Sequence, residues 1–356
     1  MTRLVSALGE FVSPHNCSKS LWIALVILAI HTSGVAAEVP TIHATHTIQC
    51  GGTDPEHRPA VVTGVAVTPK GDTVIAASDD HSVWVWDAET LALKCNLNGH
   101  SDWVHAASLS SDGSTLATGA SDHSICLWDI NSQQQVLKLP ASDGAVTALR
   151  FHPNGQQIAV VGFCDKLKIV NTSSGHTAQE LVCPCVDERT VVLSSDGERM
   201  AVAGRNGRIR IWNTNSGARE RDIETDGRRI RALAFSPDGR WLAAAGDGPS
   251  IQVFEVNTGQ LGVNLTARPA KVYAMVFVGN RQLACGGSDN SIRIWDLDTQ
   301  TVTKNLMDHT GTVAALACDA TGTTLVSGSY DTTVRVWSLS TSTPNTASRE
   351  STESIR

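Results

Sequence analysis

The chain has 356 residues, of which 41% are apolar and 18% are charged, so it is not a disordered chain, a collagen or a polytopic membrane protein. Its formal net charge of -7 at pH 7 gives it no default affinity for a nucleic-acid backbone. The chain has few aromatic residues, with six Phe and two Tyr, but it has nine Trp. This imbalance indicates one Trp-based structural device that is used several times.

The N-terminus carries a short apolar segment. Leu21–Ile30 is an unbroken run of apolar residues, with Arg3 and Lys19 before it and small residues up to Ala37 after it. Ten helical residues cover only about half of a ~30 Å hydrocarbon core. We therefore predict that residues 1–37 are a signal peptide and that the protein is exported, to a periplasm or by secretion. The alternatives are an uncleaved membrane anchor, the one case that would place the protein at a membrane, and a segment without a targeting role.

Seven copies of one pattern follow. Each copy has a Gly at a tight turn, at positions 71, 113, 155, 197, 239, 279 and 322. A second landmark comes about fifteen residues after each turn: Trp86, Trp128, Val170, Trp212, Phe254, Trp295 and Trp337. Successive landmarks of this second series are 42, 42, 42, 42, 41 and 42 residues apart. Two series that keep step over seven copies indicate an internal repeat.

Each copy predicts four short strands. In the second copy, residues 104–109, 115–118, 124–128 and 135–139 are rich in apolar and β-branched residues, and turn-forming residues separate them. One four-stranded sheet cannot bury both of its faces, whereas sheets stacked around an axis can. The predicted fold is therefore all-β, a seven-bladed propeller of four-stranded antiparallel blades. The predicted repeats cover approximately residues 58–98, 99–140, 141–183, 184–225, 226–267, 268–308 and 309–340.

The second copy also carries a signature. Gly99-His100, Asp122 and Trp128-Asp129 resemble the signature of WD40 repeats, the β-transducin type of propeller. The resemblance implies a single propeller over residues 38–340 instead of two domains. It also implies a structural hydrogen-bond chain of His, Ser or Thr, Asp and Trp inside a blade. Two copies hold the complete set: His100, Thr118, Asp122 and Trp128, then His309, Ser327, Asp331 and Trp337.

The remaining copies are incomplete. Cys285 replaces the hydroxyl in the sixth copy, and Val170 and Phe254 replace the Trp in the third and fifth, so we expect these blades to depend more on apolar packing. The seventh copy lacks a fourth strand of its own. We expect the β-branched run Thr41–Cys50 to supply it and close the ring, which removes an exposed sheet edge. Residues 341–356 are polar and are predicted to be a disordered tail.

We predict no catalytic residue, metal site or cofactor. The sequence lacks a Gly-x-Ser-x-Gly motif, a phosphate-binding loop, a dinucleotide fingerprint and a His-Glu-x-x-His motif. The predicted inner strands, such as 313–317, are apolar and small. The sets of His, Ser or Thr, and Asp recur with a Trp partner, which favours a structural role over a hydrolytic one. One disulfide is possible, between Cys164 and either Cys183 or Cys185.

Arginine is concentrated in the fourth and fifth copies. From Arg189 to Arg240 there are eleven Arg against seven acidic residues. Two interpretations stay open: a solvated face with ion pairs, or a surface for an anionic partner such as a polyanionic glycan or an acidic protein. Only Trp212 and Phe235 lie among these arginines, too few for an interleaved aromatic pattern, so nucleic acid is not predicted as a partner.

The candidate partner site is one end of the propeller. Residues at the start of each inner strand, and those in the turn after each second strand, should project at the same end, where loops on a rigid scaffold usually carry function. The candidate partner-binding residues are Trp103, Phe163, Arg205, Arg229, Lys271 and Tyr330. We predict a non-catalytic scaffold that binds a protein or another macromolecule. The alternatives are an intracellular adaptor for complex assembly and an enzyme with a site in the channel.

Overall fold

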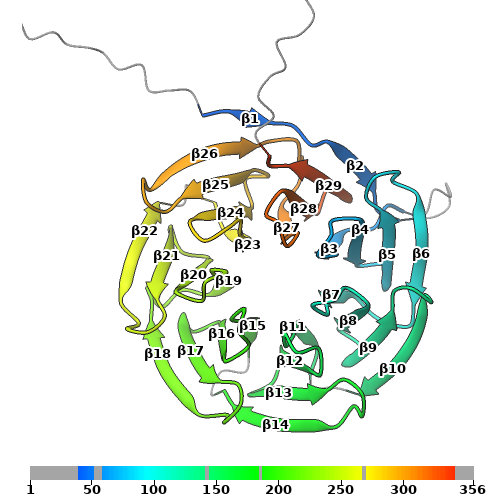
Figure 1. Cartoon of the computed structure of the whole chain (residues 1–356), viewed down its shortest axis with the longest axis horizontal. Coiled ribbons are helices and arrows are strands. Elements are labelled where there is room, and N and C mark those ends of the chain that lie inside the picture. Colours follow the sequence, from blue (N-terminus) through cyan, green and yellow to red (C-terminus); the bar gives the residue numbers. More distant parts are fainter. Residues whose placement is uncertain (1–38, 52–57, 141–143, 184–186, 267–269, 341–356) are drawn as a thin grey trace, which may run out of the picture. The chain divides into compact units, whose positions relative to one another are not determined.

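The computed structural model describes residues 39–51, 58–140, 144–183, 187–266 and 270–340, which form a ring of seven β-sheets (Figure 1). Within these ranges there are 29 strands, and no helix there has the length and apolarity needed to cross a bilayer. The prediction of an all-β propeller with seven four-stranded antiparallel blades is confirmed. The predicted signal peptide and the predicted tail lie outside the described residues.

Blades one to five each use four consecutive strands, ordered from the channel to the rim (Figure 1). The first three blades comprise β3 (Val62–Val67), β4 (Thr73–Ser78), β5 (Ser82–Asp87), β6 (Leu93–Asn98), β7 (Val104–Leu109), β8 (Thr115–Ala120), β9 (Ser124–Asp129), β10 (Gln134–Pro140), β11 (Val146–Phe151), β12 (Gln157–Gly162), β13 (Lys166–Asn171) and β14 (Thr177–Val182). The next two comprise β15 (Glu188–Leu193), β16 (Arg199–Gly204), β17 (Arg208–Asn213), β18 (Arg219–Glu224), β19 (Ile230–Phe235), β20 (Trp241–Gly246), β21 (Ser250–Glu255) and β22 (Leu261–Thr266).

Blades six and seven combine strands from both ends of the chain. Their own strands are β23 (Val272–Phe277), β24 (Gln282–Gly287), β25 (Ile292–Asp296), β26 (Thr301–Leu306), β27 (Val313–Cys318), β28 (Thr324–Ser329) and β29 (Thr333–Ser338). β2 (His46–Gln49) pairs antiparallel with β29 and is the outer strand of blade seven. β1 (Thr41–Ile42) pairs parallel with β26, so blade six has five strands.

The predicted closing strand at 41–50 is therefore divided between two blades. The division lies at His43 and Ala44, where Asp308 accepts a hydrogen bond from the Ala44 backbone N–H at 2.6 Å and lies 2.8 Å from Nδ1 of His43. These contacts turn the chain from blade six toward blade seven. The part that closes the ring is only His46–Gln49.

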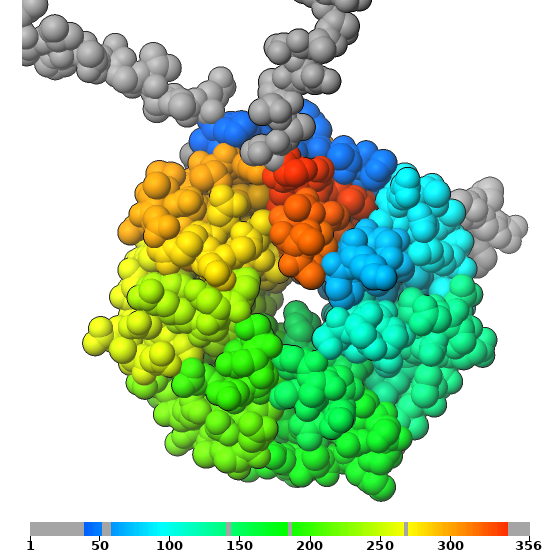
Figure 2. Space-filling view, viewed as in Figure 1, coloured from blue at the N-terminus to red at the C-terminus, as the bar shows by residue number. Residues whose placement is uncertain are grey.

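The apolar core lies between the blades. Seven clusters of buried residues each join two neighbouring blades; the cluster between blades one and two, for example, combines Ile75 and Val85 with Leu116 and Trp128. A tight turn joins the first and second strands of each blade. All seven predicted turn glycines have φ between 68° and 79°, a conformation that glycine adopts without strain. A central opening remains in the ring (Figure 2).

Candidate functional site

Blade two contains a buried chain of polar side chains. Nδ1 of His100 lies 3.2 Å from both carboxylate oxygens of Asp122, and Nε2 lies 2.8 Å from Oγ1 of Thr118. Trp128 donates its indole N–H to the same hydroxyl at 2.9 Å. Since the indole only donates and the carboxylate only accepts, the imidazole carries its proton on Nδ1 and accepts the threonine hydroxyl at Nε2.

Blade seven repeats this arrangement. Nδ1 of His309 lies 2.8 Å from Asp331, its Nε2 lies 2.7 Å from Oγ of Ser327, and Trp337 donates to that hydroxyl at 2.8 Å. Ser327 and Trp337 are completely buried. A hydroxyl in this position already has partners on both sides and no access to a substrate, so the geometry supports a structural role for both sets.

The charges in blade two are unequal. Burial raises the pKa of Asp122, but hydrogen bonds from the Ser124 hydroxyl and from the backbone N–H groups of Ser101 and Ser124 outweigh it and lower the pKa to about 2. Burial lowers the pKa of His100 below its usual value, against the opposing effect of Asp122. At neutral pH the pair is therefore a carboxylate beside a neutral imidazole.

Blade four replaces this chain with a buried ion pair. Nη1 of Arg210 donates to Oε1 of Glu188 at 3.1 Å, and both side chains are at most 1% exposed. Burial pushes the pKa of Glu188 upward, against the attraction of Arg210. Val202 stands opposite Arg210 in the strand register, as Thr118 stands opposite Cys126 in blade two. The indole N–H of Trp212 consequently has no hydrogen-bond partner among the described residues.

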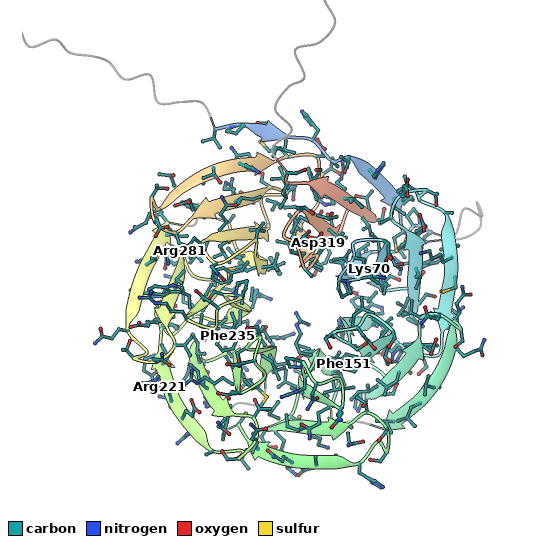
Figure 3. The ribbon with its side chains drawn as sticks, viewed as in Figure 1. Lys70, Phe151, Arg221, Phe235, Arg281 and Asp319 are labelled. Atoms are coloured by element: carbon teal, nitrogen blue, oxygen red, sulfur yellow. The ribbon has the colours of Figure 1, made fainter. Side chains whose placement is uncertain are left out.

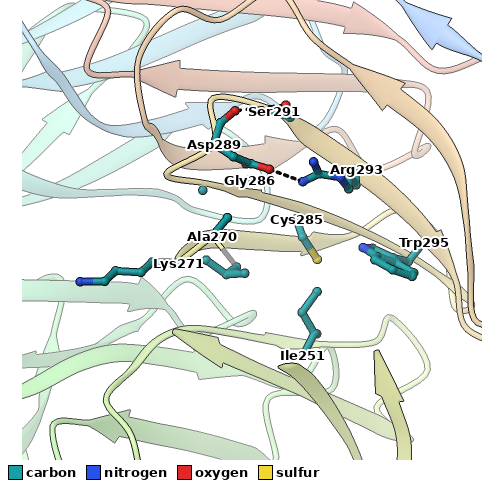
Figure 4. Close-up of a pocket in the computed structure, with 11 residues that line it drawn as sticks. Ile251, Ala270, Lys271, Cys285, Gly286, Asp289, Ser291, Arg293 and Trp295 are labelled. Atoms are coloured by element: carbon teal, nitrogen blue, oxygen red, sulfur yellow. Dashed lines mark hydrogen bonds and ion pairs between the residues drawn. The ribbon is translucent and has the colours of Figure 1, made fainter. Parts of the chain in front are cut away.

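Blade six shows a different replacement (Figure 4). Cys285 stands opposite Arg293 in the register, at the place that the hydroxyl residue takes in blades two and seven. Nη1 of Arg293 lies 2.6 Å from Oδ2 of Asp289, and Cys285 and Trp295 line a cavity of about 20 Å³ beside this pair. That volume holds about one water molecule, so the replacement leaves a small defect in packing.

Of the three cysteines in the predicted disulfide, Cys164 and Cys183 are among the described residues. Cys183 is a buried free thiol in the structure and forms no disulfide with Cys164 there, and burial raises its pKa to about 12. Cys185 lies outside the described residues, and its pairing with Cys164 stays a prediction. No three His, Cys, Asp or Glu side chains in the described ranges are grouped as a metal site would require.

The inner strand of every blade carries a β-bulge at its second residue. The register between the first two strands shifts there, as between Val104 and Ala106 of blade two. A bulge leaves one residue unpaired and re-aims its side chain. The seven bulged residues are Thr63, His105, Thr147, Arg189, Arg231, Tyr273 and Ala314. They form a ring, one from each blade, around one mouth of the central channel.

This ring surrounds a cavity of about 500 Å³, which we call the aromatic mouth. Loop residues complete its wall: Val61, Asp79, Trp103, Phe163 and Tyr330. The exposed fractions of Trp103, Phe163 and Tyr330 are 49%, 44% and 50%. Three exposed aromatic residues around a concave opening, held by three different blades, are typical of a surface that binds a macromolecule.

Two arginines of the ring stack on aromatic side chains. The guanidinium of Arg189 lies 4.6 Å from the ring centre of Phe163, and that of Arg231 lies 4.8 Å from the ring centre of Tyr273. Each also forms an ion pair. Nε of Arg189 lies 2.5 Å from Asp187, and Arg231 bonds Asp247 through Nε at 2.7 Å and Nη2 at 3.3 Å. The two guanidinium groups are thereby held in fixed orientations.

His105 faces the two arginines from blade two. Its Nε2 lies 2.7 Å from Oγ of Ser121, and its ring packs edge-on against Trp103 at 6.4 Å between ring centres. Burial lowers the pKa of His105, and the positive charge of Arg189 lowers it further. The imidazole is therefore neutral at pH 7, and the arginines supply the charge of the mouth.

The structure brings the three predicted aromatic residues together in the cavity wall, while the three predicted basic residues lie beside it. Arg229 donates to Asp187 at 3.0 Å, and Nζ of Lys271 lies 4.0 Å from Asp247. Arg205 is exposed, and its side chain has no hydrogen bond or ion pair among the described residues. All three lie in blades four to six, on the side opposite Trp103.

The ring of bulged residues was not predicted. Strict alternation assigns each inner-strand residue to one of two faces, and a bulge breaks that alternation. The available signal was periodic: His105, Arg189 and Arg231 are the second residues of three inner strands, each followed mainly by apolar residues.

The opposite mouth of the channel has different chemistry. Leu109, Phe151, Leu193 and Phe235 line a cavity of about 500 Å³, and of the described residues in its wall only Arg150 is charged. Phe151 and Phe235 lie near the central opening in Figure 3, and Arg221 lies at the rim. The charged groups that line the channel are therefore concentrated at the aromatic mouth.

The arginines on β16, β17 and β18 of blade four are paired within the propeller. Arg199 donates to Glu220 at 2.9 Å, and Arg208 pairs with Asp222 and Glu224. Arg221 donates to two backbone carbonyls of the neighbouring blade. These contacts favour the interpretation of a solvated face with ion pairs at the rim.

Comparisons with known proteins agree with this architecture. A family model described as the IFT122 first beta-propeller matches residues 61–301, which is more than half of the chain. A model described as WD domain, G-beta repeat, matches residues 300–338, which contain most of blade seven. A search of curated proteins found no match.

Proposed function

Because the chain belongs to the IFT122 first β-propeller family, a family of WD40-repeat propellers, we propose that it is a non-catalytic scaffold that holds a protein partner at the aromatic mouth. WD40 propellers generally bind proteins. The observation that carries the proposal is the exposure of Trp103, Phe163 and Tyr330 around one cavity. Aromatic residues are the usual anchors of protein interfaces.

The surroundings of His105 do not suit catalysis. With Ser121 at 2.7 Å it resembles a nucleophile and its base. No described carboxylate hydrogen-bonds to this imidazole, so the third group that orients a catalytic base is missing. The rest of the ring consists of Thr, Ala, Tyr and stacked Arg side chains, which suit binding.

The test is a double variant, Trp103→Ala with Tyr330→Ala. We expect at least about tenfold weaker capture of the partner, since truncation of an interface anchor costs about 2 kcal/mol or more. Partners are captured from the source cells on the immobilised full chain, identified by mass spectrometry and then titrated against each variant.

The matched control is Val136→Ala with Leu261→Ala, which removes two exposed apolar side chains from outer strands. Both variants should keep the melting temperature of the wild type. Equal capture by a folded Trp103→Ala, Tyr330→Ala variant would move the binding surface away from this mouth.

The proposal includes export, which rests on the apolar run Leu21–Ile30 and the small residues that follow it. An intracellular adaptor is the alternative, and the propeller serves either role with the same surface. The intact mass of the native protein separates them. Loss of residues 1–37 from exported material supports the first, and an intact chain inside the cell supports the second.

A further inference from the structure

We propose that the partner segment that enters the aromatic mouth is acidic and places a carboxylate side chain between Arg189 and Arg231. This inference rests on the proposed binding function and adds the chemistry of the partner. Three observations support it: the charges around the mouth, the N–H donors that the two arginines leave unused, and the uncharged side chains of Trp103 and Tyr330 on the opposite side.

The charge around the mouth is unequal. Blades four to six contribute five basic residues, and among the described residues the acidic partners of these five are Asp187 and Asp247. The basic residues are Arg189, Arg205, Arg229, Arg231 and Lys271. On the other side, Arg58 offsets Asp79, which it contacts at 2.9 Å. The mouth is therefore positive in a chain whose net charge is -7, which attracts an anionic partner by electrostatic steering.

The arginines retain donors for a ligand. The ion pair of Arg231 uses Nε and Nη2, and Nη1 has no hydrogen bond among the described residues. The terminal nitrogens of Arg189 likewise make no hydrogen bond within the described ranges. Because stacking on Phe163 and Tyr273 fixes both guanidinium planes, little side-chain entropy is lost when a carboxylate binds.

Opposite the arginines the described part of the wall is mostly uncharged, and its one carboxylate, Asp79, is paired with Arg58. His105 is neutral at pH 7 for the reasons given above, and Trp103 and Tyr330 carry no charge. Burial raises the pKa of Tyr330, and Tyr273 raises it further, so the phenol stays protonated. An acidic side chain flanked by apolar residues would contact the arginines on one side and the exposed aromatic rings on the other.

The test uses fluorescein-labelled hexaglutamate as the probe and the full chain in fluorescence anisotropy, with hexaglutamine and hexalysine as matched peptides. We expect hexaglutamate alone to bind, more weakly at an ionic strength of about 0.15 M than at about 0.01 M. Arg189→Gln and Arg231→Gln should each weaken binding roughly tenfold, since hydrogen bonds to charged groups are the strong ones.

Arg219→Gln is the matched control, because Arg219 is an exposed arginine on β18 that pairs with Asp222. It should bind hexaglutamate like the wild type. Absence of hexaglutamate binding, or an equal loss in Arg219→Gln and Arg189→Gln, would overturn the proposal. Melting curves identify any variant that fails to fold. If Arg189→Gln fails to fold, Arg189→Lys takes its place; it keeps the charge and should retain most of the binding of hexaglutamate.

Capture of the natural partner distinguishes a failure of this inference from a failure of the proposed function. If Trp103→Ala with Tyr330→Ala abolishes its capture while Arg189→Gln and Arg231→Gln leave it unchanged, the mouth is a binding site for a segment that is not acidic. If none of these variants changes capture, both the acidic partner and the proposed site are wrong. Inorganic phosphate at the same ionic strength should compete weakly, and strong competition would replace the carboxylate with a phosphorylated segment.

Discussion

Asp122 links three parts of blade two. One of its oxygens accepts the backbone N–H of Ser101, and both lie close to the His100 imidazole. The hydroxyl and N–H of Ser124 bond the same carboxylate. The side chain of Asp122 is 5% exposed, so these bonds form in a poorly solvated place where they strongly favour the charged form.

This arrangement predicts acid sensitivity. The pKa of Asp122 in the folded state, about 2, lies below its unfolded value of 3.8, so its stabilisation is complete above pH 4 and is lost as the pH falls toward 2. We expect this residue to remove about 2 kcal/mol from the free energy of unfolding over that window. Urea unfolding from about pH 5 to pH 2 should show a shallower fall for Asp122→Asn than for the wild type. Asp102→Asn, a neighbouring exposed acid, is the control; identical slopes for all three proteins would contradict the prediction.

Single residues were predictable from the sequence where a repeated motif specified them. His100 and Trp128 belong to such a motif, and the structure places them in one hydrogen-bonded chain. Glu188 and Arg210 were not predictable, because the strand β16 separates them and nothing in the period indicates that two charges meet inside a blade. The identity of a buried partner depends on contacts across strands, which alternation does not report.

At the scale of a strand, one difference between β16 and β8 decides whether a buried indole has a hydrogen-bond acceptor. Val202 occupies in blade four the register position of Thr118 in blade two, so the Trp212 indole lacks an acceptor. Val160 occupies this position in blade three, where Val170 replaces the indole and no acceptor is needed. The three strands have the same pairing, which makes them a natural comparison.

Substitution of threonine at the two valines should therefore have different effects. Val160→Thr buries a hydroxyl without an indole donor and should lower the free energy of unfolding by about 1–3 kcal/mol. Val202→Thr gives the N–H of Trp212 an acceptor and should cost less, by about 1 kcal/mol. Both valines are at most 3% exposed, so the sites are matched in burial. Urea denaturation of the two variants measures the difference, and equal losses would show that the register does not bring this side chain to the indole.

Strand positions were more predictable than strand partners. The alternation of Thr41–Cys50 indicated an extended segment, and the structure contains two short strands there. The alternation contained no information on Asp308, which turns the chain between them. The bulges at the inner strands could not be predicted either, since a bulge breaks the alternation from which strand faces are assigned.

For the whole molecule, the seven-bladed ring followed from the repeat period alone, but the chemistry of its mouth did not. The period predicts where each blade lies, so Trp103, Phe163 and Tyr330 could be placed at one end from sequence. The positions of Arg189 and Arg231 within the cavity required the bulges. Ring closure is the other property of the whole molecule, because β2 and β29 come from opposite ends of the chain.

Ile48 provides a test of closure. It is 6% exposed and belongs to the apolar cluster between blades seven and one. Ile48→Ala should lower the free energy of unfolding by about 2–5 kcal/mol and the Tm by roughly 5 °C or more. Thr47→Ala, at the neighbouring exposed position, should change the free energy by less than about 0.5 kcal/mol. Calorimetry measures both, and equal melting of Ile48→Ala and the wild type would mean that β2 contributes nothing to the ring.

The pairing of β2 with β29 also determines how the ring responds to a pulling force. His46 lies opposite Val336 and Gln49 lies opposite Thr333, so the chain leaves both strands at the same end of the ladder. Tension applied through the two ends would load the β1–β26 pairing first and would then separate the β2–β29 pairs one after another, starting at Val336. A shear geometry would instead load all of these hydrogen bonds together. The β2–β29 ladder closes the ring and covers a sheet edge in the absence of force. Under tension the same ladder is a mechanically weak contact in blade seven.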